Sequence, residues 1–322
     1  MRLFVFLFAA SLAGCAWAAD SKSEFDALFD AKQWESAVAH AEQRLASDAR
    51  DLGAAGDFAR VLLATRQRDR YEEAIAKLEH ALEGRADGAR GWFLLGQLYG
   101  ERARAAGLGG LSPAKKSKAA LSRAVELEPR DFEYVYALNE YLLEAPFVAG
   151  GSKSRARKVA REFAEVDADA GAMLAARVHL VEREYEEALA LLEPLRRREL
   201  VLHDATRRHL LSSAGIGMLE TGRAPRALGV FERVATEFPN NAVAHYGLGR
   251  AKLDTGDAAG AVDALTRSLE IERRLDTLYH LALALEAVGR VTEAKELLSE
   301  AAHAARGAMA EEIKRRLDAL AE

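Results

Sequence analysis

The stretch APFVAGGSKSRA at residues 145–156 carries the residue types of a phosphate-binding loop. Glycine N–H groups and a lysine at a helix start could hold a phosphate, which would indicate a nucleotide-using enzyme. The spacing does not fit that motif, because Ser152 separates Gly151 from Lys153 and the required first glycine would fall near Pro146. No strand pattern precedes the stretch either. The residues therefore favour a connection between two helices, in which proline ends the first helix and a serine caps the second.

The other residues that could do chemistry show no catalytic or metal-binding spacing. His203-Asp204 comes nearest to a dyad, but adjacent residues point in different directions on a helix. The sequence has no Gly-x-Ser-x-Gly elbow, and Cys15 is its only cysteine. We therefore predict no enzyme activity, no cofactor and no metal site. No H-x-x-x-H or H-E-x-x-H spacing occurs among the histidines, which are His40, His80, His179, His203, His209, His245, His280 and His303.

The first residues are typical of an export signal, with a basic start followed by an apolar run over 3–12. Two cleavage sites remain open. Ala16-Trp17-Ala18 would release a soluble protein after a leader of residues 1–18. Leu12-Ala13-Gly14-Cys15 resembles a bacterial lipobox, which would end the leader at residue 14 and place a lipid on Cys15. Both alternatives predict the periplasm of a Gram-negative bacterium, with the chain either soluble or anchored to the outer membrane by lipid.

The composition predicts a large helical protein. The chain has 322 residues, of which half are hydrophobic and 30% are charged, with only six prolines. Helix-forming Ala, Leu, Glu and Arg dominate, and no run of alternating β-branched residues indicates a strand. The net charge of −5 comes from interspersed charges of both signs, so the composition gives no reason to expect a nucleic-acid partner.

A repeat of about 34 residues organises the sequence, most clearly over 209–239, 242–272 and 277–305. Each segment has a helical apolar stripe that ends at a glycine, namely Gly222, Gly256 and Gly289. A second stripe then carries alanine and a large apolar residue four positions later, as in Ala227/Phe231, Ala261/Leu265 and Ala294/Leu298. Small residues let helices approach closely, and the large residue fills the space that remains.

An earlier segment strengthens this pattern with Trp92-x-x-Leu95-Gly96-x-x-Tyr99. Together these motifs resemble the tetratricopeptide repeat. The resemblance implies an all-α, right-handed superhelical solenoid of antiparallel helix pairs. We expect about eight pairs over residues 19–306, followed by a C-terminal capping helix over 307–322.

The resemblance also implies a concave groove, lined by the first helix of each pair, that binds extended protein segments. Repeat positions 5 and 9 face this groove. The corresponding residues are Phe93, Gln97, Tyr136, Glu140, Met173, Arg177, Tyr246, Arg250, Tyr279 and Leu283. Aromatic residues beside arginine are typical of binding hot spots. In this hypothesis, partner apolar side chains pack on the Tyr/Phe column, while Arg177 and Arg250 meet carboxylates or carbonyl groups.

The predicted function is a non-catalytic scaffold or adaptor for protein partners in the bacterial cell envelope. Nucleic acid is not an expected partner, and a membrane is expected only through an N-terminal lipid anchor. Two alternatives remain open. The chain could be a structural component of an envelope machine for pilus formation, secretion or outer-membrane biogenesis. It could also be a small-ligand binder or enzyme that uses the loop at 145–154.

Overall fold

The computed structural model describes residues 23–196 and 201–321, and these residues form seventeen α-helices and no strand. The predicted all-α class is confirmed. No helix in this part of the chain is both long and apolar enough to cross a membrane. The predicted leader, with either end point, and Cys15 lie outside the described residues.

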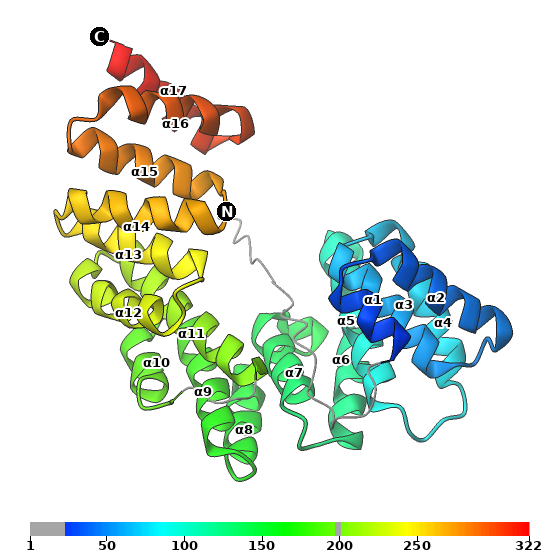
Figure 1. Cartoon of the computed structure of the whole chain (residues 1–322). Coiled ribbons are helices and arrows are strands. Elements are labelled where there is room, and N and C mark those ends of the chain that lie inside the picture. Colours follow the sequence, from blue (N-terminus) through cyan, green and yellow to red (C-terminus); the bar gives the residue numbers. More distant parts are fainter. Residues whose placement is uncertain (1–22, 197–200, 322) are drawn as a thin grey trace. The chain divides into compact units, whose positions relative to one another are not determined.

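The chain packs as two compact units, whose helices are labelled in Figure 1. The described part of unit 1 is 23–178 with 201–203, and that of unit 2 is 179–196 with 204–321. Unit 1 contains α1 (Glu24–Asp30), α2 (Trp34–Ser47), α3 (Leu52–Thr65), α4 (Tyr71–Leu82), α5 (Ala89–Ala105), α6 (Leu111–Leu127), α7 (Phe132–Glu144), α8 (Lys153–Ala164) and most of α9 (Ala168–Glu182). Unit 2 contains α10 (Tyr185–Leu192), most of α11 (Val201–Glu220), α12 (Ala224–Glu237), α13 (Ala242–Asp254), α14 (Ala258–Ile271), α15 (Leu275–Ala287), α16 (Val291–Ala304) and α17 (Ala308–Ala321).

Local sequence signals set the ends of these helices. The Asp131 carboxylate caps α7 by accepting from the backbone N–H of Tyr134, and Asn241 caps α13 in the same way. Such caps satisfy backbone donors that have no partner inside the helix. The predicted helix-ending glycines all have positive φ, at +75° for Gly222, +91° for Gly256 and +81° for Gly289. This left-handed conformation is open to glycine at little cost, so the predicted positions of these helix ends are confirmed.

The core of unit 2 shows why small and large residues alternate in the repeat. Phe231 of α12 is fully buried and lies against Gly215 of α11 and Gly247 of α13. A methyl group added at Gly215 would lie 2.6 Å from the Phe231 ring, and one at Gly247 would lie closer still. The absent side chains therefore provide the space that this ring fills.

Helix α17 follows the last helix pair and packs against α16. Its Ile313 side chain is fully buried in a cluster with residues of α13 to α16, and Leu317 and Leu320 pack against the same cluster while partly buried. The amphipathic face of α17 thus covers apolar surface that the final pair would otherwise leave exposed.

The stretch that resembled a phosphate loop connects α7 to α8. A single 3₁₀ turn, Phe147–Ala149, lies between them, and Gly150 follows with φ at +91°. The Ser152 hydroxyl caps α8 by accepting from the backbone N–H of Arg155 at 3.3 Å. Helix α7 precedes the loop where a phosphate-binding loop would have a strand. The prediction of a helix connection is therefore confirmed.

Candidate functional site

The ten residues predicted to line a groove lie on first helices, namely α5, α7 and α9 in unit 1 and α13 and α15 in unit 2. Six of them are partly exposed: Gln97, Tyr136, Glu140, Arg250, Tyr279 and Leu283. The other four, Phe93, Met173, Arg177 and Tyr246, are buried. Burial removes these four from the surface that a partner could contact directly.

Phe93 and Met173 belong to the core of unit 1. The Phe93 ring lies 4.8 Å from the Tyr134 ring of α7, so it packs between neighbouring first helices. Met173 is 2% exposed. The assumption that repeat position 5 faces the groove is therefore corrected for both residues, since large apolar side chains at this position fill the space between adjacent pairs.

Arg177 is the buried centre of an ion cluster in unit 1. Its side chain is 4% exposed, and its guanidinium donates to the carboxylates of Glu140 at 3.0 Å and Glu144 at 2.7 Å. A guanidinium held by two carboxylates of its own chain is not available to a partner. The predicted role of Arg177 as a partner contact is therefore replaced by a structural one, in which it joins α9 to α7.

This cluster changes the protonation of its members. Burial raises the pKa of Glu140 to about 7, and the opposing attraction of Arg177 does not cancel this effect. Burial likewise raises the pKa of Tyr136, which keeps its hydroxyl protonated. Glu140 can therefore gain or lose a proton near neutral pH while Arg177 stays charged.

Arg250 on α13 is placed differently. Its guanidinium carbon lies 5.9 Å from the centre of the Tyr246 ring, and its Nε–H is buried without a hydrogen-bond acceptor. Among the residues that the structure describes, no carboxylate lies within ion-pair distance of Arg250. This arginine is thus held by an aromatic face and keeps donor groups without an anionic partner.

His280 on α15 completes the surroundings of Arg250. Its ring makes edge contacts with Tyr246, 5.4 Å away, and with Tyr279, 5.2 Å away. Burial lowers the pKa of His280, and the charge of Arg250 acts in the same direction, so the ring is neutral at pH 7. Nδ1 lies 2.7 Å from the Asp276 carbonyl oxygen and must donate to it, which leaves Nε2 as an acceptor.

We name Tyr246, Arg250, Tyr279, His280 and Leu283 the α13/α15 cluster. It combines guanidinium donors, an imidazole acceptor and partly exposed apolar surface from Tyr279 and Leu283. Tyr279 and Leu283 are four residues apart and so lie on one side of α15. A cluster of this kind can hold a carboxylate or a backbone amide beside an apolar side chain.

Sequence reasoning missed Glu144 and His280 as members of these two clusters. Both could have been found from helical spacing. Glu144 follows Glu140 by four residues and so shares its side of α7, and His280 follows Tyr246 by 34 residues, about one repeat. Among the described residues, no group of histidine, cysteine or acidic side chains could hold a metal ion.

A family model of the tetratricopeptide repeat matches residues 218–284, from the end of α11 into α15. These residues therefore form a tetratricopeptide-repeat segment, and the described part of the chain has the all-helical fold of such repeats. The matched range contains all five residues of the α13/α15 cluster. Tyr246 and Tyr279 occupy one repeat position on α13 and α15, and Arg250 and Leu283 occupy another. Tetratricopeptide repeats generally form non-catalytic folds for protein interaction, so the chain has the fold of a protein-interaction scaffold.

Solved structures share this fold. A tetratricopeptide repeat protein from Parabacteroides merdae superposes with a TM-score of 0.53 at 14% identity, over 81% of this chain and 96% of that one. Yeast Tom70 superposes with a TM-score of 0.60 at 12% sequence identity, over 90% of this chain. A chain of the APC/C hetero-tetramer Cut9–Hcn1 superposes with a TM-score of 0.50 at 15% sequence identity, over 92% of this chain. This chain spans 59% of the Tom70 chain and 54% of the matched APC/C chain. No curated protein matches the sequence.

Proposed function

We propose that this protein is a non-catalytic scaffold that binds an extended segment of a partner protein on the α13/α15 cluster. The observation that carries the proposal is the Arg250 guanidinium, which has no carboxylate partner in the described chain. Its buried Nε–H has no acceptor, and an unpaired buried donor is costly to keep. A partner carboxylate or carbonyl group would supply the missing acceptor.

The chemistry of the cluster defines the segment that it fits. Arg250 donates to a carbonyl or carboxylate oxygen, while the unprotonated Nε2 of His280 accepts from an amide N–H. An extended backbone offers both kinds of group. An apolar partner side chain would then pack on Tyr279 and Leu283, which are partly exposed. Hydrogen bonds would set the register of the segment, and apolar burial would supply most of its affinity.

We also propose that the scaffold acts in the bacterial cell envelope. The support for this setting is the sequence before residue 19, with its basic start, apolar run and two alternative cleavage sites. Cys15 would carry the lipid if the second site is used. The partners would then be periplasmic or outer-membrane proteins.

A crosslinked pull-down from cells that express the tagged full chain tests the proposal. We expect partner proteins identified by mass spectrometry to be lost from an Arg250→Gln/Leu283→Ala variant and retained by Arg250→Lys. Arg267→Gln is the matched control, because Arg267 is an exposed arginine on α14, the second helix of the same pair. Partners retained equally by all four proteins would contradict binding at this cluster.

A further inference from the structure

Helix α8 concentrates positive charge in a chain that is negative overall. Its residues, Lys153–Ala164, include five cationic side chains and one acidic one, Glu162, and so carry a net charge of +4, whereas the whole chain has −5. The buried residues Ala156, Ala160 and Phe163 lie on one side of the helix, and all five cations are exposed. The cations are Lys153, Arg155, Arg157, Lys158 and Arg161. Such a face produces a positive potential in the surrounding water.

Part of this charge has no acidic partner. Arg155 and Arg161 form no ion pair with any residue that the structure describes, and Lys158 meets only Glu162, at 3.5 Å on the surface. An exposed pair of this kind contributes little, because water screens it. The guanidinium groups of Arg155 and Arg161 can therefore meet an anion from outside the chain.

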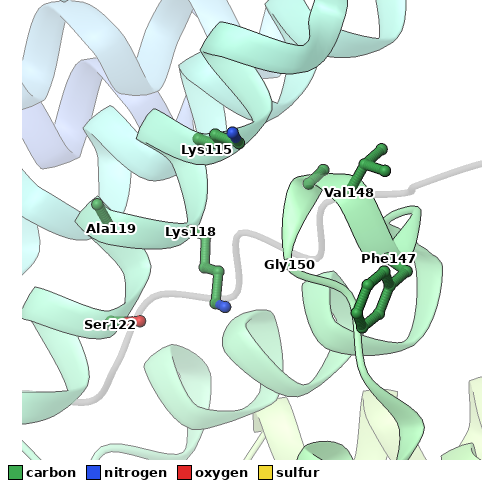
Figure 2. Close-up of a pocket in the computed structure, with 8 residues that line it drawn as sticks. Lys115, Lys118, Ala119, Ser122, Phe147, Val148 and Gly150 are labelled. Carbon is green, nitrogen blue, oxygen red and sulfur yellow. The ribbon is translucent and has the colours of Figure 1, made fainter.

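Helix α6 adds a second basic stripe beside the loop that leads into α8. Lys115, Lys118 and Ser122 are three or four residues apart, so they share one side of α6. Figure 2 shows both lysines on the helix that borders the 147–150 turn. Neither lysine has a carboxylate partner within the described residues, whereas their neighbour Lys116 contacts Glu79 at 3.6 Å.

The loop packs directly on α6. The Tyr141 hydroxyl lies 2.7 Å from the carbonyl oxygen of Ala114 on α6 and 2.8 Å from that of Ala149 in the turn. The Lys118 side chain lies against Gly150, since a methyl group added at that glycine would come within 2.6 Å of the ammonium nitrogen. Loop and helix thus form one continuous surface, which a partner would meet from outside.

The turn itself is apolar and exposed. The Phe147 side chain is 89% exposed and that of Val148 is 67% exposed. Leu111, one helical turn before Lys115 on the same side of α6, is exposed as well. Large apolar side chains held in water beside unpaired cations indicate an interaction surface.

This combination favours an anionic membrane surface over other anionic partners. A nucleic acid would use the cations, but Val148 offers no flat face on which a base could stack. A folded acidic protein would need a pocket matched to the protruding Phe147. A bilayer needs no matched pocket, because its interface accepts apolar side chains while its anionic headgroups attract lysine and arginine.

We propose that unit 1 carries a peripheral docking surface for anionic phospholipid membranes. We name it the α6/α8 face, and it consists of Lys115, Lys118, Phe147, Val148 and the five cations of α8. The cations meet lipid phosphates, while the two apolar side chains enter the boundary between headgroups and acyl chains. This contact belongs to the folded repeat region, so it is separate from any lipid on Cys15 and from the α13/α15 cluster.

Flotation of the full chain with phosphatidylcholine vesicles, with and without phosphatidylglycerol, tests the role of charge. We expect phosphatidylglycerol to strengthen binding and added salt to weaken it. Arg155→Glu/Arg161→Glu should weaken binding to the anionic vesicles about tenfold or more, since two cations become anions. Lys314→Glu/Arg315→Glu is the matched control, because it changes the net charge equally on exposed residues of α17, and it should bind like the natural chain.

Replacing the apolar turn tests membrane insertion. Phe147→Ser/Val148→Ser should weaken vesicle binding about tenfold or more, since the cations alone give only a surface contact. Val288→Ser/Val291→Ser is the matched control, because this exposed apolar pair lies at the turn between α15 and α16, and it should bind like the natural chain. The apolar run at 3–12 is common to all these proteins, so differences between them report the α6/α8 face alone.

An environment-sensitive dye gives a direct readout of insertion. Nitrobenzoxadiazole on Val148→Cys, in a Cys15→Ser background, should brighten and shift to the blue when anionic vesicles are added. The same dye on Val288→Cys should not respond.

Three results would overturn the proposal. The first is vesicle binding that does not depend on phosphatidylglycerol. The second is equal binding by the natural chain and both α6/α8 face variants, which would assign vesicle binding to another part of the chain. The third is binding of double-stranded DNA or polyglutamate without binding of anionic vesicles, which would give this face a different class of partner.

Discussion

Arg177 in unit 1 and Arg250 in unit 2 occupy the same repeat position on their first helices but have opposite electrostatic surroundings. Arg177 is buried and held by Glu140 and Glu144. Arg250 is partly exposed and lies on a tyrosine ring without a carboxylate among the described residues. The repeat sets where each guanidinium lies, and the neighbouring residues decide whether its charge is compensated within the chain.

Burial explains this difference. A buried charge must be compensated within the chain, and Arg207 of unit 2 follows the same rule by pairing with Glu237 at 2.6 Å. Arg250 is only partly buried and keeps donor groups without an anion among the described residues. If this contrast is correct, replacing Arg177 should mainly lower stability, whereas replacing Arg250 should mainly weaken partner binding.

Arg177→Ala should give the largest change in stability. It leaves the carboxylates of Glu140 and Glu144 together without their shared cation, and breaking a buried pair in this way costs about 3 kcal/mol or more. Urea unfolding followed by circular dichroism, with hydrogen exchange of peptides from α7 and α9, would measure the loss in unit 1. If Arg177→Ala lowered the unfolding free energy no more than Arg250→Ala does, the proposed difference between the two arginines would be wrong.

The pH dependence of unit 1 should show the next largest effect. Burial raises the pKa of Glu140 from its ordinary 4.5 to about 7, so the folded state holds a proton that the unfolded chain has released between these values. The stability that this proton contributes is complete below about pH 4.5 and is lost as the pH rises through 7. We expect a decline of about 1–3 kcal/mol in the unfolding free energy.

Glu140→Gln should flatten this decline, since the amide does not titrate. Unfolding measured from pH 4.5 to 8 by hydrogen exchange in α7 would detect the change. Glu286→Gln in unit 2 serves as the control and should leave the decline in unit 1 intact. If Glu140→Gln kept the full pH dependence of the unfolding free energy, groups other than Glu140 would be its cause.

Arg250→Met should change stability by less than about 1 kcal/mol, because no ion pair is lost and a buried donor without an acceptor is removed. Thermal unfolding of the full chain beside Arg177→Met is the measurement. A loss as large as that of the Arg177 variant would mean that Arg250 has a structural role.

Tyr246→Phe should have the smallest effect, below about 0.5 kcal/mol. The hydroxyl lies 3.4 Å from Nδ1 of His280, but that nitrogen donates to the Asp276 carbonyl group and cannot accept. The ring, which supports Arg250, remains. Partner binding by this variant should therefore match that of the natural chain, and a clear loss would show that the hydroxyl itself makes a contact.

The fold could be predicted from sequence because its determinants are local. The spacing of Gly222, Gly256 and Gly289 marks helix ends, and the pairing of small residues with Phe231 reports close helix packing. These signals depend only on residues within one repeat or its neighbour.

The site was harder to predict because burial depends on how adjacent pairs pack. Phe93 and Tyr246 share a repeat position with the partly exposed Tyr279, and no local pattern separates them. The exposed Phe147 was read only as part of a helix connection, although an aromatic residue outside the repeat pattern was a usable signal.

Site-specific photocrosslinking tests the central claim most directly. A benzoylphenylalanine would replace Leu283, the partly exposed apolar residue of the α13/α15 cluster, and Arg267 on α14 would carry it in the control. The account predicts a defined crosslinked protein from position 283 that disappears when Arg250→Gln is added, and no such product from position 267. Equal products from both positions, or a product from 283 that persists without Arg250, would contradict it.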